Sequence, residues 1–296
     1  NANENYFKGR PHIDKLVAKP FADQNIMTQA LMFNAIDMIV LVNPRDLPEI
    51  QGDKRFILQP YNARSYSFFG YNVRNPLLAD KRVRKAFTPA VNRQEMLDSF
   101  FNGQGTIISG PFAPGSWAYN LDVQPLPFDP EKAKALLQEV GFSRGADGFM
   151  QKDGKRLALS LKVPIEKESE AVKRVVLAFK NYLKNVGADI KVEFKEWQAW
   201  KEDVFFEHEF DIIFAIWVFD DSADISSLFH SGEIGAWKNN FGGYSNPEVD
   251  GLINESKLTL DHEKRRTINR KLHTILAEEN PYSFLWTLTN YAAYHK

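Results

Sequence analysis

A strand–helix–strand pattern in the middle of the chain constrains the fold most strongly. Residues 157–163 are predicted as a strand, and apolar residues then recur at helical spacing over 172–186 until Gly187 stops the helix. Residues 190–194 alternate as a second strand, residues 197–207 are predicted as a helix, and residues 211–217 form a third strand, which is mostly apolar. Strands joined by crossover helices favour an α/β unit with a mixed, largely parallel sheet flanked by helices.

Flanking segments extend this unit. Residues 65–73 are predicted as an aromatic strand, and helices are predicted over 80–90, 92–101 and 261–279, the first two separated by a break at Pro89. The first of these helices carries a basic run, Lys81, Arg82, Arg84 and Lys85. Such a run is typical of a solvated helix face.

The chain has 296 residues, which is longer than one average domain. We expect residues 66–280 to form the main α/β ligand-binding unit and residues 1–65 to form a smaller α/β piece. Residues 281–296 are predicted as a strand that returns to this smaller piece. The chain begins at Asn1 without a signal-peptide pattern, as a mature terminus or with tag residues at 1–2. It stops just after an aromatic strand, which is typical of a segment cut from a longer chain.

Composition excludes several classes of function. The 37 Lys and Arg residues nearly balance 38 Asp and Glu residues, and this net charge of −1 gives no electrostatic reason to expect nucleic-acid binding. The chain has no cysteine, so disulfides, thiolate nucleophiles and zinc sites with sulfur ligands are excluded. No apolar stretch approaches the roughly 20 residues that span a bilayer.

Catalytic and cofactor motifs are also missing from the sequence. The six histidines are scattered, and none forms a His-Glu-x-x-His pair. They could mark a metal or general-base site, but surface or partly buried histidines are the favoured interpretation. There is no Gly-x-Ser-x-Gly elbow, P-loop or Gly-x-Gly-x-x-Gly loop. We therefore expect no enzyme, no cofactor and no metal site.

The strand that ends at Trp217 points to a binding site. Three carboxylates follow it closely, those of Asp220, Asp221 and Asp224. Ligands of α/β sheets sit at the carboxyl ends of strands. A flat aromatic ring beside a carboxylate suits a cationic, partly apolar ligand such as a peptide amino terminus. The alternative is that Trp217 anchors the sheet edge and the acids cap the next helix.

Two loops have the composition of contact surfaces. Residues 237–244 combine aromatic and amide side chains, and Asn240 and Tyr244 are the candidate ligand contacts there. Residues 109–117 are rich in proline and glycine and could form the rim of a cleft. The alternatives are an ordinary turn before a helix and a loop that only packs.

Four segments, in order along the chain, resemble the family 5 extracellular solute-binding proteins of bacterial ABC importers, the oligopeptide, dipeptide and nickel binding type. They are residues 5–15 (Asn-Tyr-Phe-Lys-Gly-Arg-Pro-His-Ile-Asp-Lys), residues 80–93 (beginning Asp-Lys-Arg-Val-Arg-Lys-Ala-Phe), residues 109–137 (a proline loop, then Phe-Asp-Pro-Glu-Lys-Ala) and residues 241–253 (ending Tyr-Ser-Asn-Pro-Glu-Val-Asp-Gly-Leu-Ile). The resemblance implies a periplasmic-binding-protein-like (type II) lobe, plus a partial second α/β lobe. Since full-length members have a long preceding segment, it also implies a carboxy-terminal fragment.

The resemblance assigns roles to particular residues. In the family an acidic residue three positions after a strand-end tryptophan pairs with the ligand's α-amino group, and Asp220 matches that position after Trp217. Asp221 is a second candidate for the same role. A basic residue after the family's proline-containing strand holds the ligand carboxylate in some members, and Lys167 is the nearest match here.

We therefore expect an extracytoplasmic solute-binding component that holds a peptide or similar small solute between two lobes and delivers it to the membrane subunits of an ABC permease. It is expected to be a monomer, periplasmic or extracellular, and held at the membrane by the transporter or by a lipid anchor outside this fragment. Two alternatives remain. One is the same fold with a non-peptide cargo, such as a metal chelate, an oligosaccharide or an opine-like compound. The other is an interaction or signalling module without a transport role.

Overall fold

A computed structural model of the chain describes residues 1–165, 170–219 and 222–296. These residues form two compact units, one made of residues 1–61 with 290–296 and the other of residues 62–289. Residues 62–65 and 281–289 thus belong with the larger unit, although the sequence groups them with the flanking segments. The assignment of the smaller unit to a first lobe stays a prediction.

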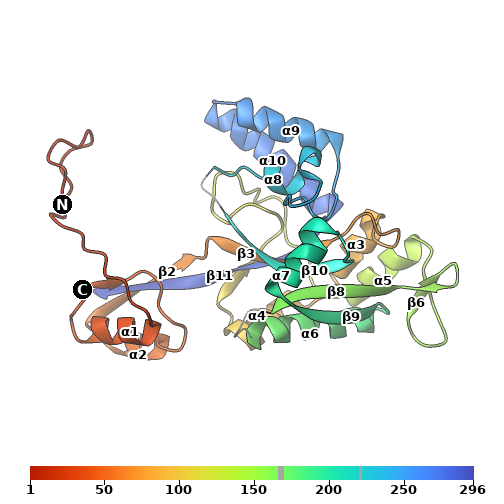
Figure 1. The fold of residues 1–296 in the computed structure, drawn as a ribbon, viewed down its shortest axis with the longest axis horizontal. Helices are drawn as coiled ribbons and strands as arrows, with labels where there is room; N and C mark the ends of the chain where they lie inside the picture. Colours follow the sequence, from red (N-terminus) through yellow and green to blue (C-terminus); the bar gives the residue numbers. More distant parts are fainter. Residues whose placement is uncertain (166–169, 220–221) are drawn as a thin grey trace. The chain divides into compact units, whose positions relative to one another are not determined.

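The larger unit is built on a mixed sheet (Figure 1). Its strands are β3 (Ser65–Tyr71), β4 (Gly105–Ile107), β8 (Ala158–Ile165), β9 (Asp189–Glu196), β10 (Ile212–Val218) and the first part of β11 (Tyr282–His295). The order is β11-β3-β10-β8-β9, and β4 pairs with β11. Strand β8 runs parallel to both of its neighbours, whereas β3 runs antiparallel to β10 and β11.

The predicted mixed α/β sheet is confirmed, and its parallel pairing is confined to β8, β9 and β10. These are the strands that the sequence pattern joins by crossover helices, as parallel neighbours require. Strands β3 and β11 reach the sheet from distant parts of the chain. Nothing in their local sequence specifies direction, and they pair antiparallel.

Helices cover both faces of this sheet. One face packs against α3 (Lys81–Phe87), α4 (Arg93–Phe101), α5 (Pro130–Glu139) and α6 (Glu170–Asn185). The other packs against α7 (Trp197–Lys201), α8 (Ser226–Phe229), α9 (Pro247–Leu258) and α10 (His262–Glu279). Figure 1 shows α4 and α6 on one side of the strands and α8 to α10 on the opposite side. A small hairpin sheet, β5 (Ser143–Arg144), β6 (Met150–Lys152) and β7 (Lys155–Arg156), lies outside this layering.

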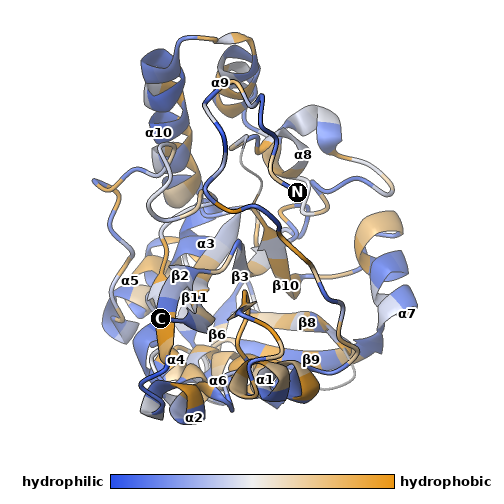
Figure 2. Ribbon diagram, turned by 90° about the vertical axis from the view of Figure 1, so that its left-hand side faces the viewer, coloured by the Kyte–Doolittle hydropathy of each residue, from blue (hydrophilic) through white to orange (hydrophobic). Residues whose placement is uncertain are grey.

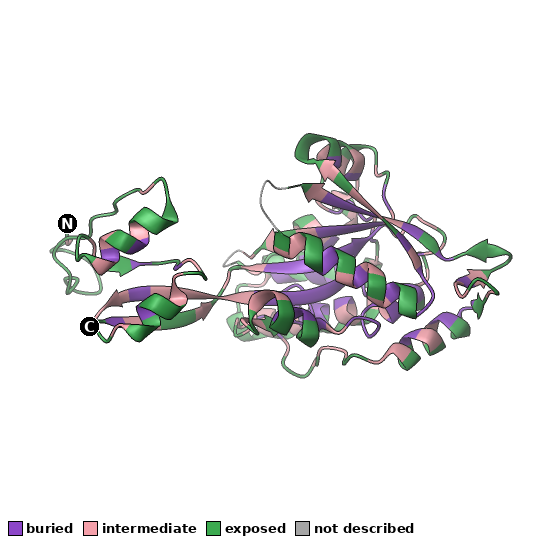
Figure 3. Ribbon diagram, turned by 90° about the horizontal axis from the view of Figure 1, so that it is seen from below, coloured by how far each residue is buried: buried purple, intermediate pink, exposed green. Residues whose placement is uncertain are grey.

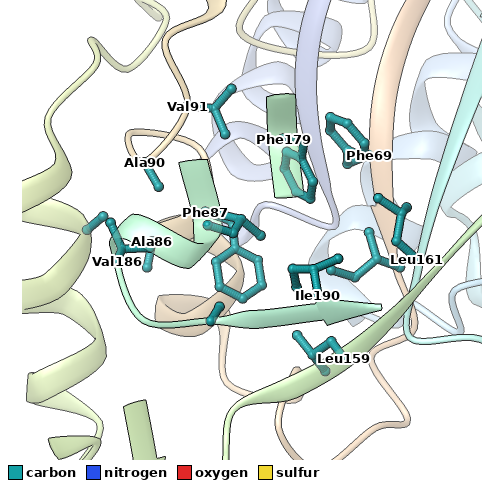
Figure 4. Packing of buried hydrophobic residues seen from close by; sticks show 14 of the residues in the cluster. Phe69, Ala86, Phe87, Ala90, Val91, Leu159, Leu161, Phe179, Val186 and Ile190 are labelled. Atoms are coloured by element: carbon teal, nitrogen blue, oxygen red, sulfur yellow. The ribbon is translucent and has the colours of Figure 1, made fainter. Parts of the chain in front are cut away.

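The helical spacing over 172–186 produces the main core contact. Phe179 of α6 stacks on Phe69 of β3, with ring centroids 3.6 Å apart (Figure 4). The outward side of α6 is exposed (Figure 3), and Leu177 on that side keeps 48% of its surface. The helix therefore buries the apolar stripe that its sequence predicts.

The basic run in α3 is not a uniformly solvated face. Arg84 is only 3% exposed, and its guanidinium donates hydrogen bonds to four backbone carbonyls, those of Leu78, Ala79, Glu279 and Asn280. Burial lowers the pKa of Arg84 from its ordinary value. A cation at the carboxyl end of a helix is favourable, because the last carbonyls of the helix lack partners within it. Arg84 therefore ties α3 to the end of α10.

Helix boundaries follow the predicted breaks, with one addition. Helix α3 ends at Phe87 and α4 begins at Arg93, so Pro89 lies between them. The predicted single helix over 197–207 divides into α7 and a π-helical turn, η1 (Glu202–Phe206). This wide turn has no clear signal in the sequence. Its residue Phe205 lines a cavity at the edge of the sheet.

The smaller unit contains short elements. They are α1 (Gln24–Met32), β1 (Met38–Ile39), α2 (Leu47–Gly52), β2 (Phe56–Asn62) and the last residues of β11. Strand β1 pairs antiparallel with β11, with Ile39 opposite Ala293. The core of this unit is a small cluster around Leu31, Ile39 and Ile50.

Hydropathy follows the layering of the larger unit. Figure 2 shows hydrophilic residues predominating along α10, whereas β10 is largely hydrophobic. Among the described residues, every helix is too short or too polar to cross a bilayer.

Candidate functional site

The carboxyl ends of β8 and β10 form a switch point in the sheet. Strand β8 leads toward α6 on one face, whereas β10 leads toward α8 on the other. The paired residues of β8 and β10 stop at Lys162 opposite Ile213, although both strands continue. Adjacent strand ends whose connections leave over opposite faces open a crevice, and ligands of α/β sheets bind there.

An aromatic cavity of about 150 Å³ lies at this crevice. We define it by its main walls, Trp197, Trp200, Phe205, Ile216, Trp217 and Phe241. Among the described residues that line it, Lys173 is the only charged one. Such a cavity can take an apolar group but offers an ion little to bind.

A polar cavity of about 560 Å³ is also lined by Trp217. We define it by Arg64, Tyr66, Trp117, Trp217, Asp224 and Asn239. The Trp217 ring lies 6.1 Å from the rings of both Phe68 and Phe241 and is nearly parallel to each. Trp217 is therefore a wall that the aromatic and polar cavities share.

The polar cavity contains an unsatisfied hydroxyl. Tyr66 is 2% exposed, and its hydroxyl has no hydrogen-bond partner among the described residues. Burial raises the pKa of this phenol well above its ordinary value, so it is neutral and can donate or accept a hydrogen bond. A buried polar group without a partner is costly.

Asp224 gives this cavity an ionised carboxylate. Burial acts to raise its pKa, but hydrogen bonding from Ser226 and the charges of Lys257 and Arg265 outweigh that effect, so the pKa lies below its ordinary value. The backbone N–H of Ser226 donates to the carboxylate over 2.9 Å. Asp224 therefore accepts a hydrogen bond from the first residue of α8 while also lining the cavity, and the N-cap position of this helix is Ile225.

A buried histidine holds the proline loop that forms one wall of the polar cavity. The backbone N–H of Asn120 donates to Nδ1 of His273 over 3.1 Å, which leaves the ring proton on Nε2, where it can be donated to Ser109 Oγ at 2.9 Å. Gly110 lies against the same ring, and a Cβ there would come within 2.5 Å of it. The loop is thus fixed to α10 by a neutral imidazole.

Stability is expected to fall with acidification because of His273. Burial lowers the pKa of His273 from 6.5 to about 4, so below pH 6.5 the unfolded chain takes up a proton that the folded chain still excludes. At pH 5 this removes about 2 kcal/mol of stability relative to neutral pH. Urea unfolding of the wild type and a His273→Gln variant at pH 7.5 and 5 measures the effect. The loss is smaller in the variant, and an equal loss in both contradicts this role.

The predicted site residues divide into three groups. Trp217 lines both cavities. Lys167, Asp220 and Asp221 lie outside the described residues. Asn240 and Tyr244 are buried within their own loop and are not among the residues that line the two cavities.

The amide of Asn240 is fully used inside its loop. Its nitrogen donates to the carbonyls of His230 and Tyr244, and its oxygen accepts from the backbone N–H of Tyr244. The flanking residues face the cavities instead, with Phe241 in the aromatic wall and Asn239 in the polar one. The ligand-binding role of Asn240 and Tyr244 stays a prediction.

Most residues of the aromatic wall were not predicted from the sequence as site residues. Trp197, Trp200 and Phe205 fall in a segment predicted only as a helix. A signal was present, because residues 197–206 contain two tryptophans and two phenylalanines, which is unusually aromatic for a short surface helix. No cluster of three or more metal-binding side chains occurs in the part of the chain that the structure describes.

Comparison with known proteins identifies the family. The model of one protein family, described as "Bacterial extracellular solute-binding proteins, family 5 Middle", matches residues 1–237. This match covers most of the chain, so the chain belongs to the bacterial extracellular solute-binding proteins, family 5. The predicted family is confirmed, and with it the expectation of a binding protein and not an enzyme.

Curated relatives have different cargoes. The chain is 29% identical over 296 residues to the oligopeptide-binding protein AppA of Bacillus subtilis, a match that covers 99% of this chain and 54% of the relative. It is 26% identical over 289 residues to heme-binding protein A of Haemophilus influenzae, covering 95% of this chain and 50% of the relative. It is also 26% identical over 282 residues to the dipeptide-binding protein of Escherichia coli, covering 95% and 51%. The chain spans about half the length of these relatives.

Solved structures show the same fold. The structure of B. subtilis AppA in complex with a nonapeptide matches with a TM-score of 0.76 and 28% identity, covering 99% of this chain and 58% of that one. HbpA2 from Haemophilus parasuis matches with a TM-score of 0.85 at 22% identity, covering 99% and 56%. NikZ from Campylobacter jejuni, solved with Ni(L-His), matches with a TM-score of 0.73 at 24% identity, covering 93% and 55%. The last two comparisons concern the fold alone.

Proposed function

We propose that this chain is the ligand-binding part of an extracytoplasmic solute-binding protein that delivers peptides to an ABC permease. The observation that carries the proposal is the pair of cavities separated by Trp217 at the carboxyl ends of β8 and β10. A peptide has polar and charged main-chain groups beside side chains that are often apolar, and one polar and one aromatic cavity suit such a ligand. The likeness to the oligopeptide-binding protein AppA supports a peptide cargo.

The charged ends of the peptide have candidate partners. Asp220, three residues after Trp217, pairs with the ligand's α-amino group, and Asp221 is the second candidate. Lys167 is the candidate for the ligand carboxylate. A charge-assisted pair of this kind gives both affinity and orientation, because each charge needs a partner once the site excludes water.

Location and partners follow from the family. We propose that the full-length protein works as a monomer outside the cytoplasm and meets the membrane subunits of the permease there. Its proposed cargo is a peptide, because the aromatic cavity of about 150 Å³ has the size of one apolar side chain.

Native mass spectrometry tests this function. The full-length protein, purified under non-denaturing conditions from its own host, is expected to carry a bound mass that fragments as a peptide. Unfolding in acid releases the ligand for sequencing by tandem mass spectrometry. A co-purifying heme, metal chelate or sugar, with no peptide, overturns the proposal and identifies the real cargo.

A further inference from the structure

We infer that the aromatic cavity is a selective subsite that takes a benzene-sized or branched apolar side chain of the ligand. This inference rests on the proposed function, and it adds a preference in ligand sequence. It predicts that the protein does not treat all peptides alike. A peptide with phenylalanine or leucine near its amino terminus should be preferred over one with alanine or lysine there.

The volume of the cavity suits one such group. It measures about 150 Å³. Protein cavities of roughly 150 Å³ lined by apolar side chains stay free of water and bind benzene. A methyl group leaves most of this space empty, and a cationic group loses its hydration beside Lys173, the only charged residue among the described ones that line the cavity. The cavity therefore binds apolar groups of a limited size most favourably.

The walls of the cavity are held in place by contacts among themselves. Trp197 stacks on Trp200, with centroids 5.3 Å apart, and Trp200 meets the edge of Phe205 at 5.9 Å. Phe205 in turn meets the edge of Phe241 at 5.5 Å, and Phe241 stacks against Trp217. This chain of ring contacts leads from α7 through η1 to β10. Stacked and edge-to-face pairs are favourable in themselves, so the cavity is formed before a ligand arrives.

The π-helical turn η1 places Phe205 in this wall. The backbone N–H of Glu207 donates to the carbonyl of Glu202 over 2.9 Å, which is the five-residue spacing of a π-helix. In a regular α-helix a residue five positions after Trp200 would point well away from it, since each residue turns the chain by about 100°. The wider turn brings Phe205 back beside Trp200. Such turns are often found at functional sites.

Apolar side chains at the mouth are exposed to solvent. Ile165 at the end of β8, Trp197 at the start of α7 and Ile216 in β10 keep 49%, 41% and 52% of their surfaces exposed. All three line the cavity. An exposed apolar group around a concave site indicates a surface that a ligand covers. The three residues come from three different elements, so the sheet topology assembles this mouth.

The shared wall determines which part of the ligand enters. Trp217 separates the aromatic cavity from the polar cavity. A ligand whose amino group is held just beyond Trp217 lies over this ring. The side chain that reaches the aromatic cavity then belongs to a residue near that amino group. The preference should accordingly be strong at one of the first two ligand positions and weak at the third.

Calorimetry with tripeptides tests the inference in the full-length protein. The probes are Ala-Ala-Ala and its variants with Phe, Leu or Lys at each position in turn. We expect Phe or Leu at one of the first two positions to bind about tenfold or more tightly than Ala, as burial of such a side chain implies. Lys at that position binds more weakly than Ala.

Two variants link the preference to the cavity. Ala215→Leu adds a branched side chain to the cavity lining and is expected to reduce the Phe-to-Ala affinity ratio to about one. Ala199→Leu is the matched control, because Ala199 is an exposed residue of α7 that does not line the cavity, and it should keep the wild-type ratio. If Ala215→Leu does not fold, Ile216→Ser at the exposed mouth takes its place and should lower the ratio about threefold.

The outcomes separate this inference from the proposed function. Peptide binding with no preference at any position overturns the subsite and leaves the peptide function standing. A preference that Ala215→Leu keeps also overturns it, because the selective site then lies elsewhere. If no peptide binds, the proposed function fails and the inference fails with it. A preference that Ala215→Leu abolishes and Ala199→Leu retains supports both.

Discussion

Replacement of Arg84 by leucine is expected to lower the free energy of unfolding of the larger unit by about 4 kcal/mol. The leucine leaves four backbone carbonyls without their donors, two of them at the end of α10. Each carbonyl that stays buried without a partner costs roughly 1 to 3 kcal/mol, and local relaxation toward water recovers part of the sum. All six tryptophans fall within residues 62–289, so tryptophan fluorescence during urea unfolding reports on this unit alone.

Arg82→Leu is the matched control for this prediction. Arg82 lies two residues earlier in the same helix, and its guanidinium pairs with the carboxylate of Asp80 at the surface. Exposed pairs contribute about 0 to 1 kcal/mol, so this variant should stay close to wild type. Equal losses in the two variants would contradict the buried network of Arg84 as the cause, since leucine and arginine have nearly the same helix propensity.

The Asp220→Ala variant of the full-length protein is expected to bind peptide about 100-fold more weakly than wild type. Removal of the carboxylate leaves the ligand's α-amino group without its partner in a site that excludes water, which typically costs 2 to 5 kcal/mol. Isothermal titration calorimetry with the co-purifying peptide measures the change. An N-acetylated form of the same peptide supplies the complementary test, because it lacks the positive charge and should bind wild type equally poorly.

The neighbouring acid serves as the control for position. Asp221→Ala should weaken binding by less than tenfold if Asp220 carries the ion pair. If Asp221→Ala instead weakens binding more than Asp220→Ala does, Asp221 is the residue that pairs with the ligand's α-amino group. Unchanged affinity in both variants contradicts the proposed recognition of the amino terminus.

Local sequence predicted the central α/β unit because its elements carry their own signals. The apolar stripe of α6, the stop at Gly187 and the strand β9 depend on nearby residues only, and each is found in the structure, although Phe194 of β9 is exposed. Strand pairing beyond this unit depends on residues far apart. The contact between β3 and β11 joins Phe68 to Phe284, and no local pattern specifies such a pair.

The site was only partly predictable for the same reason. Trp217 could be identified because the strand and its acidic continuation are adjacent in the sequence. The rest of the aromatic cavity is assembled from α7, η1 and the loop at Phe241, so its composition becomes visible only when these segments meet. The buried role of Arg84 could not be predicted for a different reason. A basic run has the same sequence pattern whether its side chains face solvent or the carbonyls at the end of a helix.

Hydrogen exchange of the full-length protein, with and without the co-purifying ligand, tests the central claim most directly. We claim that the ligand lies at the carboxyl ends of β8 and β10, against the wall shared at Trp217 and beside the proline loop. Backbone amides in residues 214–219 and 109–117 should therefore exchange more slowly when the site is saturated, while those of the hairpin over 143–156 stay unchanged. Saturation that leaves both segments unaffected and protects other segments instead would contradict this location of the site.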